Sequence, residues 1–135
     1  MEISDILIVD DDADLRRTLF HLLDKTYKVV EAASGPGALL FLRAQRPRLV
    51  LLDVSMIAMS GIEVLRAARE LDKTLRIVML TSHQEIELAK IALDLGTIAY
   101  VTKPFDADFI RGEVARLLAP PADEAGGVRP WRVVE

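Results

Sequence analysis

The sequence predicts a doubly wound α/β fold, in which helices cover both faces of a five-stranded parallel sheet. Short apolar runs alternate five times with longer segments of helical period along the 135 residues. Strict alternation favours parallel strands, because each parallel crossover needs a covering helix. The runs at 6–9 and 49–52 are wholly apolar, as expected for strands buried on both faces. A chain of this length can support one domain with a sizeable core.

The first two strand–helix units precede Pro47. A buried strand at 6–9 is followed by an amphipathic helix at 12–25. The leucines of this helix recur at helical spacing: Leu15, Leu19, Leu22 and Leu23. A second strand is predicted at 27–32 and a second helix at 34–46, which Pro47 ends because proline cannot continue a helix.

The third unit begins with the apolar strand at 49–52, which runs into Asp53. A loop then leads to Ser60, a residue type that caps helix N-termini. Glu63 stands three residues later, where it completes a capping box. The apolar residues of the helix that follows are Ile62, Leu65 and Ala68.

The remaining two units follow the same pattern. We expect a strand at 76–80, a helix at 84–95, a strand at 98–102 and a helix that ends at 118. Gly96 suits the end of the fourth helix, and either Asp106 or Asp108 can cap the fifth.

Charged and hydroxyl side chains follow four of the predicted strands. They are Asp10, Asp11 and Asp12 after the first, Asp53 after the third, Thr81 and Ser82 after the fourth, and Lys103 after the fifth. Open parallel sheets bind ligands at the carboxyl ends of their strands. Two carboxylates about 4 Å apart repel by roughly 4 kcal/mol at an effective dielectric constant of ~20. A hard divalent cation relieves this repulsion, and Mg²⁺ prefers oxygen ligands and a substrate phosphate.

Each of these residues also has a plainer explanation. Asp11 and Asp12 can cap the first helix, and Asp53 can be an ordinary loop acid. Thr81 and Ser82 can cap the next helix, and Lys103 can be a surface lysine. Their joint position at strand ends favours a phosphate-handling site, with a carboxylate as nucleophile and a lysine for a phosphoryl oxygen.

The same residues carry a resemblance to a known family. The stretches "ILIVDDDADLRRTL", "RLVLLDVSMIAMSGIEVL", "RIVMLTSH" and "GTIAYVTKPF" resemble the receiver domain of bacterial two-component response regulators. The resemblance covers residues 3–118 and implies a flavodoxin-like (βα)₅ fold with strand order 2-1-3-4-5.

The resemblance implies roles for the strand-end residues. Asp53 is similar to the phosphoacceptor, which takes a phosphoryl group from a phosphohistidine and loses it slowly by self-hydrolysis. The expected cofactor is Mg²⁺ or Mn²⁺, held by Asp10, Asp11, Asp53 and the backbone carbonyl of Ser55. The expected phosphoryl-binding and switch residues are Thr81, Lys103 and Tyr100, with a cis peptide bond before Pro104.

Ser55 lies two residues after the phosphoacceptor Asp53, and His83 lies two residues after the switch threonine Thr81. Both are expected to tune the rate of dephosphorylation. Ile57 and Ala58 depart from the family pattern, which has proline and often glycine there, so the loop lacks a residue that fixes φ. The chemistry of the site does not depend on these two residues.

The predicted fourth helix carries more apolar residues than one buried stripe needs. Leu88, Ile91, Ala92 and Leu95 form one face, and Ile86, Ala89 and Leu93 form another beside Tyr100. Extra apolar area can mark a partner surface. The resemblance implies a partner or homodimer face on the fourth helix, fifth strand and fifth helix, with Ile86, Ala89, Leu93 and Tyr100 as its expected residues.

The chain is expected to divide into a receiver domain at 1–118 and a proline- and glycine-rich tail or linker at 119–135. The expected partner is a sensor histidine kinase or a phosphotransferase. A net charge of −4 without a basic block argues against direct nucleic-acid binding. No apolar run is long enough for a membrane span, and the absence of cysteine fits a cytoplasmic protein.

Two other functions remain open at this point. A receiver fold can act as an interaction module that phosphorylation does not regulate. A haloacid-dehalogenase-type phosphatase would use Asp10 as nucleophile in the pattern Asp10-x-Asp12, but Asp14 stands where that family has threonine or valine. We expect a signalling phosphoacceptor rather than an enzyme.

Overall fold

The computed structural model describes residues 4–56, 59–82 and 85–118, except for the side chains of residues 86 and 89. One parallel sheet forms its centre, in the order β2 (Val29–Ala32), β1 (Ile6–Val9), β3 (Leu49–Asp53), β4 (Ile77–Thr81) and β5 (Ala99–Thr102). The predicted strand order 2-1-3-4-5 is therefore confirmed. The expected tail at 119–135 lies outside the described residues.

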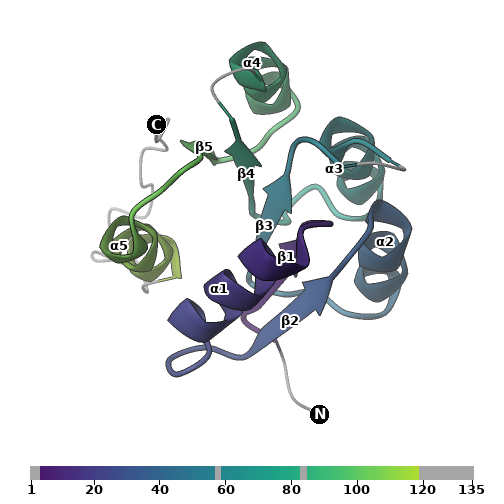
Figure 1. Ribbon diagram of the computed structural model, residues 1–135. Helices are drawn as coiled ribbons and strands as arrows, with labels where there is room; N and C mark the ends of the chain where they lie inside the picture. The colour runs from purple at the N-terminus through teal and green to yellow at the C-terminus, as the bar shows by residue number, and fades with distance from the viewer. Residues whose placement is uncertain (1–3, 57–58, 83–84, 119–135) are drawn as a thin grey trace, which may run out of the picture.

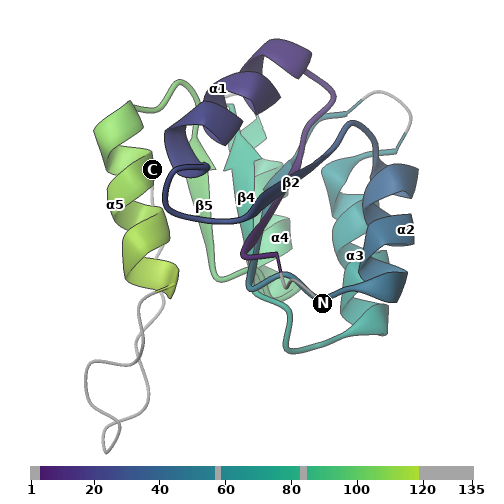
Figure 2. The same cartoon turned by 90° about the horizontal axis from the view of Figure 1, so that it is seen from below.

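Five helices cover the two faces of this sheet (Figure 1). They are α1 (Ala13–Leu23), α2 (Gly35–Ala44), α3 (Gly61–Leu71), α4 (Ile86–Asp94) and α5 (Ala107–Leu118). Figure 2 shows α1 and α5 on one side and α2, α3 and α4 on the other. Within the described residues, none of these helices is long and apolar enough to cross a lipid bilayer.

Alternate residues of each strand face the two helical layers, which gives two hydrophobic clusters. Leu7 and Val9 of β1 pack with the cluster under α2, α3 and α4. Ile6 and Ile8 of the same strand pack with the cluster under α1 and α5. All four side chains are fully buried, as expected for a central strand with both faces covered.

Capping side chains set where the helices begin. Asp12 accepts hydrogen bonds from the backbone nitrogens of Asp14 (3.0 Å) and Leu15 (3.2 Å), so α1 begins at Ala13 and Asp12 is its N-cap. Ser60 and Glu63 form the predicted capping box at the start of α3. Asp106, not Asp108, accepts from a first-turn nitrogen of α5, that of Phe109, at 3.1 Å.

The strand predicted at 27–32 begins two residues later, at Val29. The backbone nitrogen of Tyr27 donates to the carbonyl of Leu23 at 2.9 Å and so still belongs to the turn that ends α1. The apolar character of Tyr27 therefore reflects packing beside the sheet and not a place in the strand.

Helix α4 has both buried and exposed apolar side chains among those described. Ala92 is fully buried, whereas Leu88 is 40% and Ile91 44% exposed. Leu93 and Leu95 are half-buried against the cluster that contains Tyr100. At about 100° per residue, Ile91 and Leu93 lie on opposite flanks of Ala92, and in the structure Leu93 packs against the sheet while Ile91 is exposed. Among the described side chains of α4, Leu88 and Ile91 are the exposed large apolar residues. Leu93, an expected residue of the partner face, is half-buried, and the partner face itself stays a prediction.

Candidate functional site

The acidic residues after β1 and β3 come together at the carboxyl edge of the sheet. These strands are parallel neighbours with Val9 opposite Leu52, which brings the following residues, Asp10 and Asp53, side by side. Asp10, Asp11 and Asp53 each offer a carboxylate oxygen, and the three atoms lie within 4.8 Å of one another. Residues far apart in the chain therefore form one cluster of carboxylates, as the sequence predicted.

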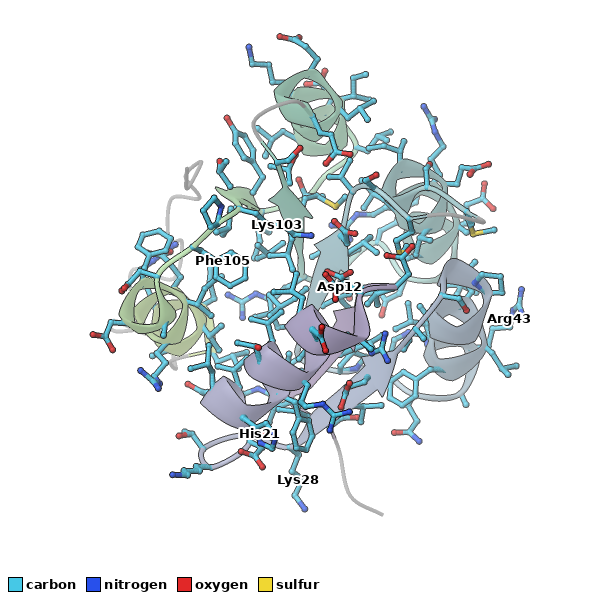
Figure 3. The ribbon with its side chains drawn as sticks, viewed as in Figure 1. Asp12, His21, Lys28, Arg43, Lys103 and Phe105 are labelled. Atoms are coloured by element: carbon cyan, nitrogen blue, oxygen red, sulfur yellow. The ribbon has the colours of Figure 1, made fainter. Side chains whose placement is uncertain are left out.

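Lys103 directly follows β5, and its side chain extends into this cluster of carboxylates. Figure 3 shows the side chain near the carboxyl end of β3. Its ammonium nitrogen lies 3.0 Å from Oδ1 of Asp53 and 3.4 Å from Oδ2 of Asp10. The side chains of both aspartates are almost completely buried, and that of Lys103 is 27% exposed. One lysine is therefore shared between two buried carboxylates. The peptide bond between Lys103 and Pro104 is cis.

Burial and charge shift the pKa of Asp53 to about 6 from its ordinary 3.8. Loss of water around the carboxylate contributes most, and the negative charge of Asp10 adds to it. The hydrogen bond and charge of Lys103, with a backbone hydrogen bond from Ser55, lower the pKa but do not cancel the rise. Lys103 and the Ser55 backbone therefore do not fully offset the cost of ionising Asp53, and a further cation would stabilise its ionised form.

The pKa of Lys103 is raised, although burial alone would lower it. Burial lowers it, but the hydrogen bonds and charges of Asp53 and Asp10 together outweigh burial and leave the pKa above its usual 10.5. Lys103 is therefore charged at neutral pH, and one positive charge faces the three carboxylates.

The donor set of this site fits a hard divalent cation. It consists of three carboxylates, and neither histidine nor cysteine joins them among the described residues. Mg²⁺ and Mn²⁺ take oxygen ligands of this kind, whereas Zn²⁺ in proteins is usually bound by nitrogen or sulfur. Asp10, Asp11 and Asp53 are accordingly the residues that could hold such an ion.

Thr81 ends β4, next to the strand that carries Asp53. Its side chain is fully buried, and its hydroxyl donates to the carbonyl of Ser82 at 3.1 Å. The backbone nitrogen of Lys103 donates to the carbonyl of Thr81 at 2.6 Å. Thr81 is thus tied to Lys103 through the main chain while its hydroxyl is engaged outside the carboxylate group.

Tyr100 lies in β5 opposite Met79 and is only 3% exposed, inside the cluster covered by α2, α3 and α4. Ser55 is exposed directly after β3, where its backbone contacts Asp53. His83 lies outside the described residues, as do the side chains of Ile86 and Ala89.

Two residues beside the site were not singled out from the sequence. Arg16 of α1 donates from Nη1 to the carbonyl of Asp10 at 2.7 Å and from Nε to Glu31 at 3.1 Å. Gly61 begins α3 so close to β3 that a Cβ atom there would stand 2.2 Å from the carbonyl oxygen of Asp53. Neither contact has a sequence signal of its own, because each depends on how a helix packs back against the end of the strand that precedes it.

Comparison with known proteins shows the family to which the chain belongs. The family model described as "Response regulator receiver domain" matches residues 6–115. Sporulation initiation phosphotransferase F of Bacillus subtilis is 37% identical over 114 residues, which are 84% of this chain and 92% of that protein. Transcriptional regulatory protein ZraR of Escherichia coli is 37% identical over 116 residues, but the match spans only 26% of its length.

A solved structure shows the same fold. The chain resembles chemotaxis protein CheY4 of Vibrio cholerae with a TM-score of 0.78 and 30% identity, covering 87% of this chain and 100% of that one. Several other relatives are longer regulators, of which this chain spans half or less.

Proposed function

The chain belongs to the response regulator receiver domain family, and we propose that it is a phosphoacceptor that takes a phosphoryl group onto Asp53 and changes a partner surface in response. The observation that carries this proposal is the position of Lys103, whose ammonium nitrogen lies 3.0 Å from Asp53 and 3.4 Å from Asp10 in the group of carboxylates.

The phosphoryl donor is a phosphohistidine on a histidine kinase or a phosphotransferase. A carboxylate oxygen of Asp53 forms a bond to phosphorus while the bond from phosphorus to the imidazole nitrogen breaks. The imidazole keeps that electron pair, and the product is an aspartyl phosphate. Such a transfer depends mainly on alignment and on stabilisation of charge.

Lys103 provides the fixed positive charge for this step. Its ammonium group already contacts Asp53 and can shift to a phosphoryl oxygen without leaving the site. When bound by Asp10, Asp11, Asp53 and the carbonyl of Ser55, Mg²⁺ or Mn²⁺ would add positive charge against the phosphoryl oxygens.

The response begins at Thr81. An added phosphoryl group brings about two negative charges, as in phosphoserine. The Thr81 hydroxyl, which donates to the carbonyl of Ser82 in this structure, would turn to a phosphoryl oxygen instead. We propose that this movement of Thr81 favours the buried position of Tyr100. The balance between alternative conformations of α4 would shift as a result.

The surface of α4, β5 and α5 is the proposed output face, for a second copy of the chain or another partner. Leu88 and Ile91 are its exposed large apolar residues among those described. The phosphoryl group is then lost by slow hydrolysis, and Ser55 and His83 are proposed to set its rate.

Phosphorylation with a small-molecule donor tests the proposal. Purified protein incubated with acetyl phosphate and Mg²⁺ should gain the mass of one phosphoryl group, and borohydride reduction followed by peptide mapping should place it at Asp53. Asp53→Asn should gain none. Modification at Asp10 would instead indicate phosphatase-like chemistry, and no modification of the wild-type chain would favour an interaction module that phosphorylation does not regulate.

A further inference from the structure

We infer that Arg16, held in place by Glu31, is a positioning residue that fixes Asp10 for metal binding. This inference rests on the proposed function, because it concerns the same cluster of carboxylates. Arg16 touches neither Asp53 nor the carboxylate of Asp10 in the hydrogen bonds of this structure. It acts on the main chain of Asp10, through the 2.7 Å hydrogen bond to its carbonyl oxygen.

Asp10 is held at each of its polar groups. Its backbone nitrogen donates to the carbonyl of Ala32 at 3.2 Å, and its Oδ1 accepts from the backbone nitrogen of Asp12 at 2.9 Å. Its Oδ2 contacts Lys103 at 3.4 Å. The carbonyl oxygen is the remaining group, and β1 has already ended at Val9, so no strand partner takes it. Arg16 supplies the donor that the sheet does not.

Glu31 determines where the guanidinium of Arg16 lies. It stands on β2 opposite Ile8, two residues before Asp10 on the neighbouring strand. Its carboxylate accepts from Nε of Arg16 at 3.1 Å, so a second nitrogen of the same planar group is directed at the carbonyl of Asp10. The side chain of Arg16 is only 17% exposed, which limits the alternatives open to it. A lysine would lack the rigid planar group that holds two donors at a fixed separation, so its single ammonium nitrogen would not direct one donor to each acceptor in the same way.

This arrangement leaves the carboxylate oxygens of Asp10 directed at Asp12 and at the metal-binding group. A cationic side chain on the carboxylate itself would compete with a metal ion, whereas one on the carbonyl does not. Removing a residue that hydrogen-bonds to a metal ligand typically lowers metal affinity by 10–100-fold. Arg16 therefore meets the geometric requirement for such a partner.

Metal binding measured without any phosphoryl donor tests this inference. Mn²⁺ binding is followed by the loss of its free electron paramagnetic resonance signal, in wild-type protein and in Arg16→Ala, Arg16→Lys and Arg17→Ala. Arg17 is the matched control, because it is the next residue of the same helix, is exposed and carries the same charge. Circular dichroism at the same temperature establishes that each variant is folded.

The expected result is a Kd for Mn²⁺ raised about tenfold or more in both Arg16 variants and within about twofold of wild type in Arg17→Ala. Glu31→Gln should raise the Kd as well, and adding it to Arg16→Lys should cause little further change if the two side chains act as one unit. Folded Arg16 variants that bind Mn²⁺ as Arg17→Ala does would overturn the inference while leaving the proposed function intact. Wild-type protein that binds no Mn²⁺ would overturn both.

Discussion

The ammonium nitrogen of Lys103 lies 3.0 Å from a carboxylate oxygen of Asp53, although fifty residues separate the two in the chain. The contact exists because β3 and β5 flank β4 in one parallel sheet and end at the same edge. It joins the proposed phosphoacceptor to the group that would stabilise the incoming charge, so changing either partner should have a distinct and measurable effect.

Replacing Lys103 by methionine should slow phosphorylation of Asp53 by acetyl phosphate about 100-fold, because a fixed charge on the reacting group is lost. Mn²⁺ affinity should stay the same or increase, since a positive charge has left the carboxylate group. Intact-mass time courses and metal titrations measure the two effects. Lys25→Met, at an exposed position after α1, is the control and should behave as wild type. Equal phosphorylation rates in the two variants would refute the role of Lys103.

The stability of the metal-free protein should depend on pH through Asp53. The pKa of Asp53 is about 6 in the folded state and 3.8 when unperturbed, so the folded state binds this proton more tightly than the unfolded chain does. The resulting contribution to the free energy of unfolding is fully present below pH 3.8 and is lost as the pH rises through about 6. It amounts to roughly 3 kcal/mol.

Asp53→Asn removes this titration. In chelator, the variant should be more stable than wild type above pH 7 by up to roughly 3 kcal/mol, and the difference should shrink toward zero near pH 4. Urea unfolding at several pH values measures it, and excess Mg²⁺ should reduce the gap by stabilising wild type. A difference that does not vary with pH would contradict the assignment to Asp53.

Gly61→Ala should destabilise the fold by about 2 kcal/mol or more. The new Cβ would stand 2.2 Å from the carbonyl oxygen of Asp53 and 2.7 Å from Cα of Val54, and backbone atoms cannot move aside as a flexible side chain does. Gly112 in α5 is the control, since a Cβ there meets no heavy atom within 4 Å. Gly112→Ala should stabilise the protein by about 0.5–1 kcal/mol through helix propensity. Chemical unfolding of both variants measures the contrast, and similar effects would refute the close approach.

Replacing Leu88 and Ile91 by serine should weaken the proposed output contact. These side chains are 40% and 44% exposed, so their loss should leave the free energy of unfolding within about 1 kcal/mol of wild type. Sedimentation with and without beryllofluoride and Mg²⁺ should show self-association that depends on the phosphoryl mimic in wild type and is reduced in the double variant. Leu40→Ser, on α2 at 68% exposure, is the control for loss of surface apolar area. A double variant that associates as wild type does would remove α4 from the output face.

Much of this architecture could be predicted from local patterns, because alternating apolar runs and helix caps are short-range signals. The predicted strand ends alone place Asp10, Asp53 and Lys103 at one edge of the sheet. The exposure of single residues on α4 could not be predicted in this way, since Leu88, Ile91 and Leu93 are similarly apolar and only packing against the sheet distinguishes them.

The contacts of Arg16 and Gly61 could not be predicted for a different reason. Each depends on how closely two segments approach across the sheet edge, and that distance is set by tertiary packing. Asp12 illustrates a middle case: three acids in a row suggested both a cap and a metal ligand, and the structure divides these tasks, with Asp12 capping α1 and Asp10 and Asp11 joining Asp53.

Because one lysine serves two buried carboxylates, the domain carries a built-in counter-ion. Lys103 offsets part of the negative charge of Asp10 and Asp53 before any metal binds. Readiness to receive a signal would then follow the free magnesium level, and bound magnesium would supply the compensation for Asp53 that Lys103 leaves incomplete.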